Sequence, residues 1–236
     1  MIEVPLTAAY ELVDQTADFV VVYKKPGVGF HREAGLPGVF EQVKFSEGLA
    51  EAYPVHRLDK VTSGLLLIAK NAKANHALTH AFAQRQVQKF YLAVSDKKPK
   101  KKQGLIKGDI VAARRGAWRL LPSNINPAIT QFFSCGLGQG QRLFILKPHT
   151  GKTHQLRVAL KSLGAPIMGD GLYADANQAV AKDRCYLHAY SLLFELNGKT
   201  YCYRELPREG SAFMTPEFRA AVAAYASPEK LPWPVL

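Results

Sequence analysis

The stretch that decides the fold is residues 53–70, which read YPVHRLDKVTSGLLLIAK. Its second half, residues 65–69, is a continuous apolar run that predicts a buried strand. Its first half carries a dense set of polar side chains, namely His56, Arg57, Asp59, Lys60, Thr62 and Ser63. A polar loop that leads directly into a core strand can hold reactive groups rigidly.

Asp59 is the isolated carboxylate of this loop, with Arg57 and Lys60 beside it in the chain. Cationic neighbours favour the ionised form of a carboxylate. Taken alone, an aspartate of this kind is more often a turn residue in a surface ion pair. The rest of the chain has to decide between a turn residue and a reactive one.

Composition describes a globular protein with a polyanionic partner. The 236 residues are 47% hydrophobic and 21% charged, and 31 Lys and Arg against 19 Asp and Glu give a net charge of +12. Such an excess favours nucleic acid before membrane, because no basic amphipathic helix with exposed bulky apolar residues stands out. No apolar stretch is long enough to span a bilayer. The N-terminus lacks the basic and apolar regions of a secretory signal. Three cysteines without a paired spacing indicate a reducing, cytoplasmic setting.

The hydrophobic pattern predicts a strand-rich α+β chain. Strands are expected at 18–23, 65–69, 89–94, 104–111, 118–121, 129–135, 142–147, 186–196 and 199–204. Helices are expected at 39–52, from a cap at Asn71 to Arg85, from a cap at Thr153 to Gly164, and at 215–226. Nothing marks a flexible linker, so we expect one continuous domain whose two lobes share a sheet.

Two basic segments suggest contacts with an anion. Residues 97–102, KKPKKK, form a solvated loop that can touch phosphates by charge alone. In the helix that follows Thr153, the spacing of His154, Arg157 and Lys161 places them on one polar edge. That edge is either plain solvation or a set of cations aimed at phosphates or at a buried carboxylate.

Several motifs resemble those of one enzyme family. Residues 56–70, HRLDKVTSGLLLIAK, resemble the signature HRLDxxTSGLLL of the RluA family of pseudouridine synthases. Further similar segments are KPG at 25–27, RQVQKFY at 85–91, TGKTHQLR at 150–157, GAPIMGDGLY at 164–173 and LHA at 187–189. These motifs stand in family order over roughly residues 19 to 205, which makes chance similarity very improbable.

The resemblance implies a pseudouridine synthase catalytic fold, an α+β fold with a mixed, mainly antiparallel sheet bisected by an RNA cleft and flanked by helices. It implies a single catalytic domain over 1–236, with a core at about 19–205 and a C-terminal helix and tail at 215–236. The implied reaction isomerises a uridine in ribosomal or transfer RNA without cofactor or metal. We expect a cytoplasmic monomer without an obligate protein partner, and no RNA-binding module of the S4 type before residue 18.

The resemblance also assigns residues. Asp59 matches the catalytic aspartate, Tyr91 the tyrosine that packs on the target base and is proposed to assist proton removal at C5, and Arg157 the arginine that pairs with the aspartate. Leu156 matches a wall of the uracil pocket, and Arg57 an arginine thought to help base flipping or hold RNA. Further expected substrate-binding residues are His56, Thr62, Lys89, Lys152 and His154. Lys152 stands where the family has arginine, which leaves a local phosphate or loop contact in doubt.

The chemistry is consistent with these residues. Breaking the glycosidic bond and rejoining uracil through C5 requires a nucleophile or anion beside C1′, which a carboxylate in a closed pocket can supply. A bidentate Arg157 would match that carboxylate. The target uridine must leave its stack, and an aromatic ring such as Tyr91 can receive it. Whether Asp59 attacks C1′ or promotes a glycal intermediate stays open at this stage.

Two other functions remain to be weighed. One is an RNA-binding or RNA-folding protein on the same scaffold, without catalysis, although Asp59, Tyr91 and Arg157 are all present. The other is a glycosidase-like hydrolase built on Asp59. That chemistry uses paired carboxylates, and no second acid accompanies the motif in the sequence.

Overall fold

The computed structural model describes residues 9–236, which form one sheet of eleven strands. The strands are β1 Tyr10–Gln15, β2 Phe19–Lys24, β3 Tyr53–Pro54, β4 Ser63–Ala69, β5 Gln88–Ser95, β6 Gln103–Ala112, β7 Trp118–Leu121, β8 Ala128–Gly138, β9 Gln141–Pro148, β10 Leu187–Leu196 and β11 Lys199–Arg204. The α-helices are α1 Val39–Ser46, α2 Ala72–Ala83, α3 Gln155–Ser162, α4 Ala176–Val180 and α5 Pro216–Ala223. No helix of the described residues is long and apolar enough to cross a membrane.

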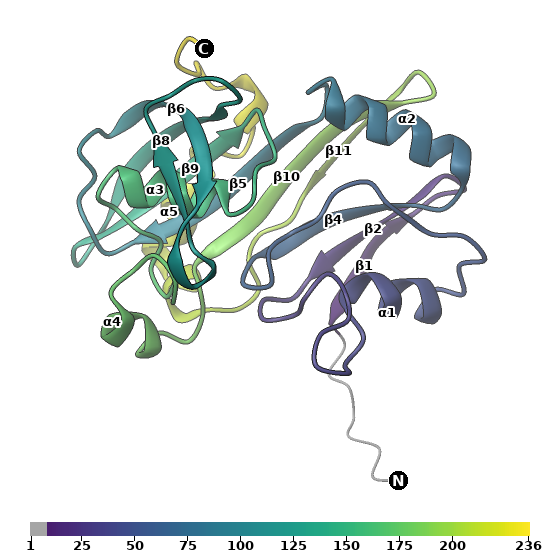
Figure 1. Ribbon diagram of the computed structural model, residues 1–236, viewed down its shortest axis with the longest axis horizontal. Helices are drawn as coiled ribbons and strands as arrows, with labels where there is room; N and C mark the ends of the chain where they lie inside the picture. Colours follow the sequence, from purple (N-terminus) through teal and green to yellow (C-terminus); the bar gives the residue numbers. More distant parts are fainter. Residues whose placement is uncertain (1–8) are drawn as a thin grey trace, which may run out of the picture.

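The sheet is mixed and mainly antiparallel, which confirms the expected fold class. Its order is β1-β2-β4-β10-β5-β9-β8-β6-β7, with β11 beside β10 and β3 beside β4. The parallel pairing is between β4 and β10, and all other strand pairs are antiparallel. Figure 1 shows β10 between two halves, one built on β1, β2 and β4 and the other on β5 to β9.

Strand β4 is buried on both faces, as its continuous apolar run predicts. One face packs with α1, through the buried side chains Val20, Val22, Leu66, Ile68, Val39 and Val43. The other face packs with α2, through Phe19, Val21, Leu65, Leu67, Ala74 and Leu78. Two helices on opposite faces explain why this strand shows no alternation of polar residues.

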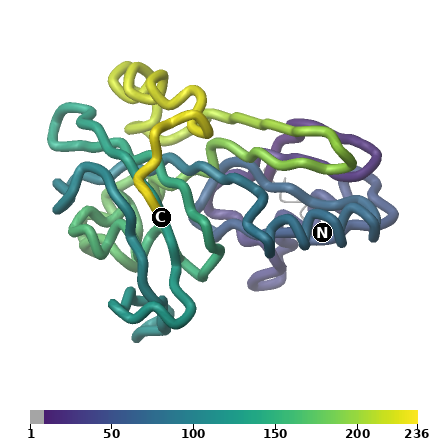
Figure 2. The backbone as a smooth tube through the Cα atoms, turned by 90° about the horizontal axis from the view of Figure 1, so that it is seen from above, coloured from purple at the N-terminus to yellow at the C-terminus, as the bar shows by residue number. Residues whose placement is uncertain are grey.

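The other half has its own core, which α3 and α5 cover. Its buried residues include Phe90, Leu92, Phe144, Leu146, Leu160 and Phe218. Figure 2 shows α5 and the C-terminal tail lying together on this half of the molecule. Trp233 of that tail stacks on Phe90, with ring centroids 5.8 Å apart.

Local signals for helix caps and hairpins are confirmed. The Asn71 side chain accepts a hydrogen bond from the backbone N–H of Ala74 and starts α2. Asn197 and Gly198, with φ of 51° and 74°, form the two-residue loop between β10 and β11. The side chain of Thr215 caps α5, in which Pro216 takes the first helical position.

Several boundaries differ from the prediction. The helix expected at 39–52 ends at Ser46, and α2 ends at Ala83 and not at Arg85. Helix α3 begins at Gln155 with left-handed His154 as its cap, so the cap at Thr153 is wrong. The Gln155 side chain folds back and accepts from the N–H of Lys152, which satisfies the loop in its place. Strand β1, the two-residue strand β3 and helix α4 were not predicted. The expectation for the N-terminus falls partly on residues 1–8, outside the described residues.

The two halves of the sheet meet at a short parallel pairing of β4 with β10. Ser63 pairs with His188, and Gly64 pairs with Ala189. The Ser63 hydroxyl lies 2.8 Å from Nδ1 of His188 and accepts a hydrogen bond from Arg184 at 2.6 Å. These buried polar groups satisfy one another, so the junction is closed by hydrogen bonds as well as by packing.

Replacing Gly64 by alanine should destabilise this junction. Gly64 has φ 107°, and a Cβ there would lie 2.2 Å from the Ala189 carbonyl oxygen. Backbone strain and overpacking together predict a loss of about 3 kcal/mol or more in the free energy of unfolding, measured by urea titration. Gly136→Ala is the matched control, because an added Cβ there meets nothing within 4 Å. Equal stability of the two variants would contradict the close approach of the strands.

Candidate active site

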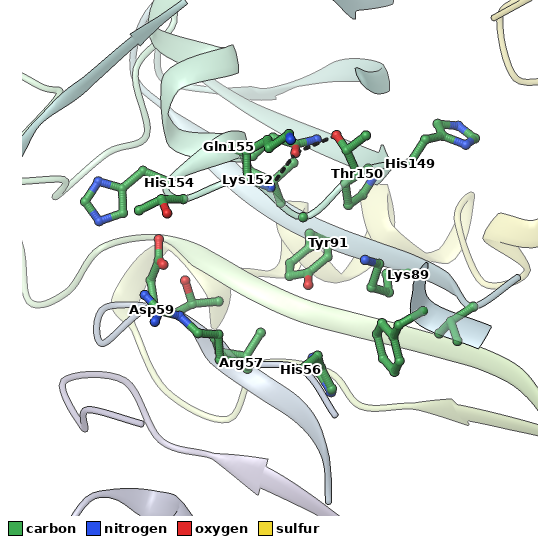
Figure 3. A pocket seen from close by; sticks show the side chains of 18 of the residues that line it. His56, Arg57, Asp59, Lys89, Tyr91, His149, Thr150, Lys152, His154 and Gln155 are labelled. Carbon is green, nitrogen blue, oxygen red and sulfur yellow. Dashed lines mark hydrogen bonds between the residues drawn. The ribbon is translucent and has the colours of Figure 1, made fainter. Parts of the chain in front are cut away.

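A cavity of about 580 Å³ lies where the two halves of the sheet meet. Its walls come from residues 55–62, from strand β5 and from residues 148–157. All ten residues expected for the site line it, namely His56, Arg57, Asp59, Thr62, Lys89, Tyr91, Lys152, His154, Leu156 and Arg157. Figure 3 shows several of them converging from both walls. The fold thus brings together side chains that are up to a hundred residues apart.

Asp59 lies in a tight turn before β4, and its side chain is 22% exposed. Its carbonyl accepts from the N–H of Thr62 at 3.0 Å, which holds the turn closed. The ammonium of Lys60 points elsewhere, because it forms an ion pair with Glu33 at 2.7 Å. Lys60, although next to Asp59 in the sequence, therefore forms no ion pair with it. Arg57, the other neighbouring cation, lies exposed at the rim of the cavity.

Lys24 stabilises this turn through hydrogen bonds. The sequence analysis did not predict this role. Its side chain is fully buried, and its Nζ donates to the carbonyls of Lys25 at 2.8 Å, Val28 at 2.7 Å and Lys60 at 3.2 Å. Burial lowers the pKa of Lys24 to about 7, while the nearby Asp59 acts in the opposite direction. One ammonium thus ties the loop after β2 to the loop that carries Asp59.

Arg157 is the buried cation behind Asp59, with a side chain only 5% exposed. Its Nε and Nη2 each donate to a different oxygen of Asp170 at 2.8 Å. Its Nη1 donates to Oδ2 of Asp59 at 3.4 Å. Burial opposes its charge, but Asp170 outweighs that effect and raises the pKa of Arg157. The expected bidentate contact with Asp59 is therefore wrong: the fork binds Asp170, and Asp59 receives one long contact.

Asp170 is the residue of the site that sequence reasoning missed. Its side chain is fully buried, and it also accepts from the backbone N–H of Leu172 at 3.0 Å. It follows Gly169, whose φ of 76° and lack of a side chain allow the backbone to approach the carbonyl of Arg184. The motif GAPIMGDGLY contained this aspartate, and a lone acid among apolar residues and glycines was the available signal. Of the two readings of the basic edge of α3, a cation aimed at a buried carboxylate is confirmed for Arg157, which binds Asp170. Lys161 does not share this position, because its side chain is exposed.

Tyr91 lies on β5 with its ring in the cavity. Phe90 and Leu92 are fully buried in the core and Tyr91 between them is partly exposed, but Ala93 is also fully buried, so the expected half-buried strand is wrong beyond Tyr91. In the view of Figure 3 the Tyr91 ring lies between the side chains of Asp59 and Lys89. Burial, and to a smaller extent the charge of Asp59, raises the pKa of Tyr91. The ring therefore carries a neutral hydroxyl, which can donate a hydrogen bond but accepts a proton only weakly.

His56 has a structural task. Its Nε2 accepts from the backbone N–H of Leu67 at 3.0 Å, and its ring stacks on Phe82 with centroids 4.8 Å apart. Burial, helped by the charge of Lys89, lowers the pKa of His56 to about 3. The imidazole is thus neutral, with its acceptor nitrogen already used by strand β4.

The remaining wall residues have separate positions. Thr62 and Leu156 are buried, and they form apolar or uncharged surface beside Asp59. The Nζ of Lys152 donates to Asn126 at 2.7 Å at the exposed rim. His154 shares a hydrogen bond of 2.8 Å with the hydroxyl of Tyr173, whose ring lies 5.0 Å from the Arg157 guanidinium. Among the described residues, no group of three His, Cys, Asp or Glu side chains could hold a metal ion.

Comparison with known proteins decides the family. The sequence model described as RNA pseudouridylate synthase matches residues 18–162. The chain belongs to the RNA pseudouridylate synthase family. A relative from Haemophilus influenzae, named as an uncharacterized RNA pseudouridine synthase, is 45% identical over 91% of this chain and 95% of its own length. The synthase fold predicted from the motifs is thus confirmed, and so is isomerase activity on RNA.

Other relatives agree. The ribosomal large subunit pseudouridine synthase C of Rickettsia bellii is 40% identical over 59% of this chain, but the match covers only 48% of that relative. Among solved structures, human RNA pseudouridylate synthase domain containing 1 superposes with a TM-score of 0.71 and 26% identity, over 84% of this chain and 83% of the other. Human RNA pseudouridylate synthase domain containing 4 gives 0.68 and 26%, over 90% and 91%. These structures confirm the synthase architecture.

Removing the acid that holds Arg157 should damage both stability and turnover of this synthase. In Asp170→Asn a buried guanidinium loses its bidentate partner, so the free energy of unfolding should fall by about 3 kcal/mol or more. Thermal or urea unfolding and RNA turnover measure the two effects. Asp96→Asn, at a partly exposed position outside the cavity, should leave both nearly unchanged. A fully stable and active Asp170→Asn variant would show that the pair is dispensable.

A neutral His56 predicts a definite pH dependence. The unfolded chain takes up a proton near the ordinary pKa of 6.5, whereas the folded synthase resists it until about pH 3. The stability that His56 contributes is therefore complete above pH 6.5 and is lost as the pH falls toward 3. Relative to His56→Gln, the wild type should lose about 2 kcal/mol of unfolding free energy between pH 7 and pH 5. A constant difference between the two proteins would mean that His56 titrates normally.

Proposed function

We propose that Asp59 is the catalytic aspartate of this synthase and acts at C1′ of a uridine flipped out of an RNA strand. The observation that carries the proposal is that Asp59 is the single carboxylate lining the cavity among the described residues. It is partly exposed and is backed by the buried Arg157. A carboxylate in such a position can approach a sugar carbon, while the cation behind it preserves its charge.

The reaction requires an anion beside C1′ of the ribose, and two mechanisms are compatible with this requirement. The C1′–N1 bond breaks, uracil turns, C5 bonds to C1′, the hydrogen on C5 leaves as a proton, and N1 takes up a proton, so that the product is an isomer of the substrate. Asp59 either adds to C1′ and is displaced by C5, or removes a proton from the sugar and returns it after a glycal intermediate. In both routes the free oxygen of Asp59 has to face the ribose, and its contact with Arg157 at 3.4 Å leaves that oxygen available.

Arg157 and Tyr91 complete the proposed machinery. Arg157 is fixed by Asp170, so it holds Asp59 without having to follow the substrate. The Tyr91 ring offers an aromatic face to the flipped base. Its raised pKa favours a neutral hydroxyl, so we infer that Tyr91 acts as a wall and hydrogen-bond donor, and not as a tyrosinate base. Leu156 closes the pocket for the base, and Arg57 at the rim is placed to hold RNA.

A hydrolase with two carboxylates does not fit this site. The second acid nearby is Asp170, which is fully buried. Both of its oxygens accept hydrogen bonds from Arg157, so it has no oxygen free for a general acid or base role. A purely RNA-binding function is disfavoured by membership in a family of isomerases and by the intact Asp59, Tyr91 and Arg157.

The RNA target is proposed at the level of class. A uridine in ribosomal or transfer RNA fits the net charge of +12 and the basic segment at 97–102. Ribosomal RNA gains support from the name of the Rickettsia bellii relative.

We propose that residues 1–236 act as one catalytic domain and as a monomer, because one chain supplies every wall of the cavity. Three free thiols fit a cytoplasmic setting.

Asp59→Asn should abolish pseudouridine formation while the protein stays folded and keeps its affinity for RNA. Removing the reacting anion is expected to reduce turnover by about a thousandfold or more. Release of tritium from RNA labelled at C5 of uridine measures turnover, and total RNA from cells lacking the gene supplies the substrate. Asp96→Asn serves as the control. Turnover retained by Asp59→Asn would disprove the role of Asp59, and no turnover by the wild type would disprove the proposed substrate class.

A further inference from the structure

The cavity extends beyond the position proposed for the flipped uridine. Figure 3 shows Lys89 beyond Tyr91 on the side away from Asp59. Phe82, which lies under the Lys89 ammonium, and Arg85 also line the cavity. Lys89 stands two residues before Tyr91 on β5, so both side chains leave the same face of the strand, about 6.6 Å apart along it. A spacing of this size is comparable to one nucleotide of an extended RNA strand.

Lys89 is a partly buried cation without an anion. Burial lowers the pKa of Lys89. None of the ion pairs formed within residues 9–236 involves its ammonium. The nitrogen lies over the ring of Phe82, 5.4 Å from its centroid. A desolvated ammonium that faces a cavity without a counter-charge is unfavourable in the free protein. Such a group gains most when an anion enters.

The ammonium is nevertheless held in place by a chain of contacts from the core. The backbone N–H of Leu67 in β4 donates to His56, and His56 stacks on Phe82. Phe82 in turn lies under Lys89. Because His56 is neutral, it supports this arrangement without adding a competing charge of either sign. The same strand that follows Asp59 therefore fixes the far end of the cavity.

The charge at this end is uniformly positive. Arg85 is exposed at the end of α2, where its left-handed backbone, with φ 58°, turns the chain toward β5. Arg85 and Lys89 line the cavity together, and in the described part of the chain Asp59 is the only acid of the lining. Cations arranged in this way suit a phosphate group better than a neutral base.

We propose that Lys89, with Arg85 at the rim, binds the backbone phosphate of a nucleotide next to the flipped uridine. The inference rests on the proposed function, since it uses the position assigned to that uridine. Phosphate binding would hold the RNA strand while the base turns, and it would supply the anion that Lys89 lacks. His56, Phe82 and Lys89 then act as one unit, with His56 as a positioning residue.

The test compares Lys89→Met with wild type on total RNA from cells lacking the gene. Methionine keeps the length of the stem and removes the charge, so folding should be preserved. The apparent KM should rise about tenfold, while kcat changes much less, because the lost contact holds RNA outside the reacting nucleotide. Lys44→Met, an exposed lysine on α1, is the matched control and should change neither constant. An unchanged KM, or a loss confined to kcat, would overturn the proposal.

Binding to RNA provides a second readout that does not depend on turnover. An oligouridylate of about ten nucleotides, within the usual range of single-strand site sizes, is titrated at several salt concentrations in the Asp59→Asn background. Losing one phosphate contact should lower the slope of log K against log salt by about 0.7 in Lys89→Met, and Lys89→Arg should restore it. An equal slope in all variants would exclude a phosphate at Lys89. Absence of pseudouridine formation by the wild type would instead count against the proposed function.

Discussion

The site depends on one constraint, which is that the guanidinium of Arg157 is buried and cannot remain without anionic partners. Asp170 meets this need with two hydrogen bonds of 2.8 Å, and Asp59 receives only the remaining Nη1 at 3.4 Å. Because the stronger pair is complete without Asp59, this carboxylate, which we propose to react, keeps an oxygen for the substrate. An arginine bound in bidentate fashion to Asp59 would have occupied both of its oxygens.

Hydrogen bonds between buried polar groups also join the two halves of the sheet. Strands β4 and β10 touch over two residue pairs, and Gly64 allows the backbones to approach there. Ser63, His188 and Arg184 satisfy one another beside it. Asp59 lies four residues before Ser63, so the turn that presents it is continuous with the strand at this close approach.

Two ionisable side chains near Asp59, His56 and Lys24, are kept neutral or fully bonded. Burial lowers the pKa of His56 to about 3, and its acceptor nitrogen is used by Leu67. Lys24 donates to three carbonyls. Lys89 is the exception, since its burial is not matched by any anion among the described residues. This contrast is the reason why we propose that the end of the cavity at Lys89 binds a backbone phosphate of the RNA.

The sequence by itself determined much of the local structure and singled out the groups that we propose to react. The apolar run at 65–69, the cap at Asn71 and the turn at Asn197 and Gly198 act through neighbouring residues, so their structures were predictable. Motifs also identified Asp59. Only the tertiary structure decided that Arg157 binds Asp170 first and that His56 supports Phe82. A guanidinium fork fits any carboxylate and an imidazole fits many partners, so the choice depends on which groups the folded chain buries side by side.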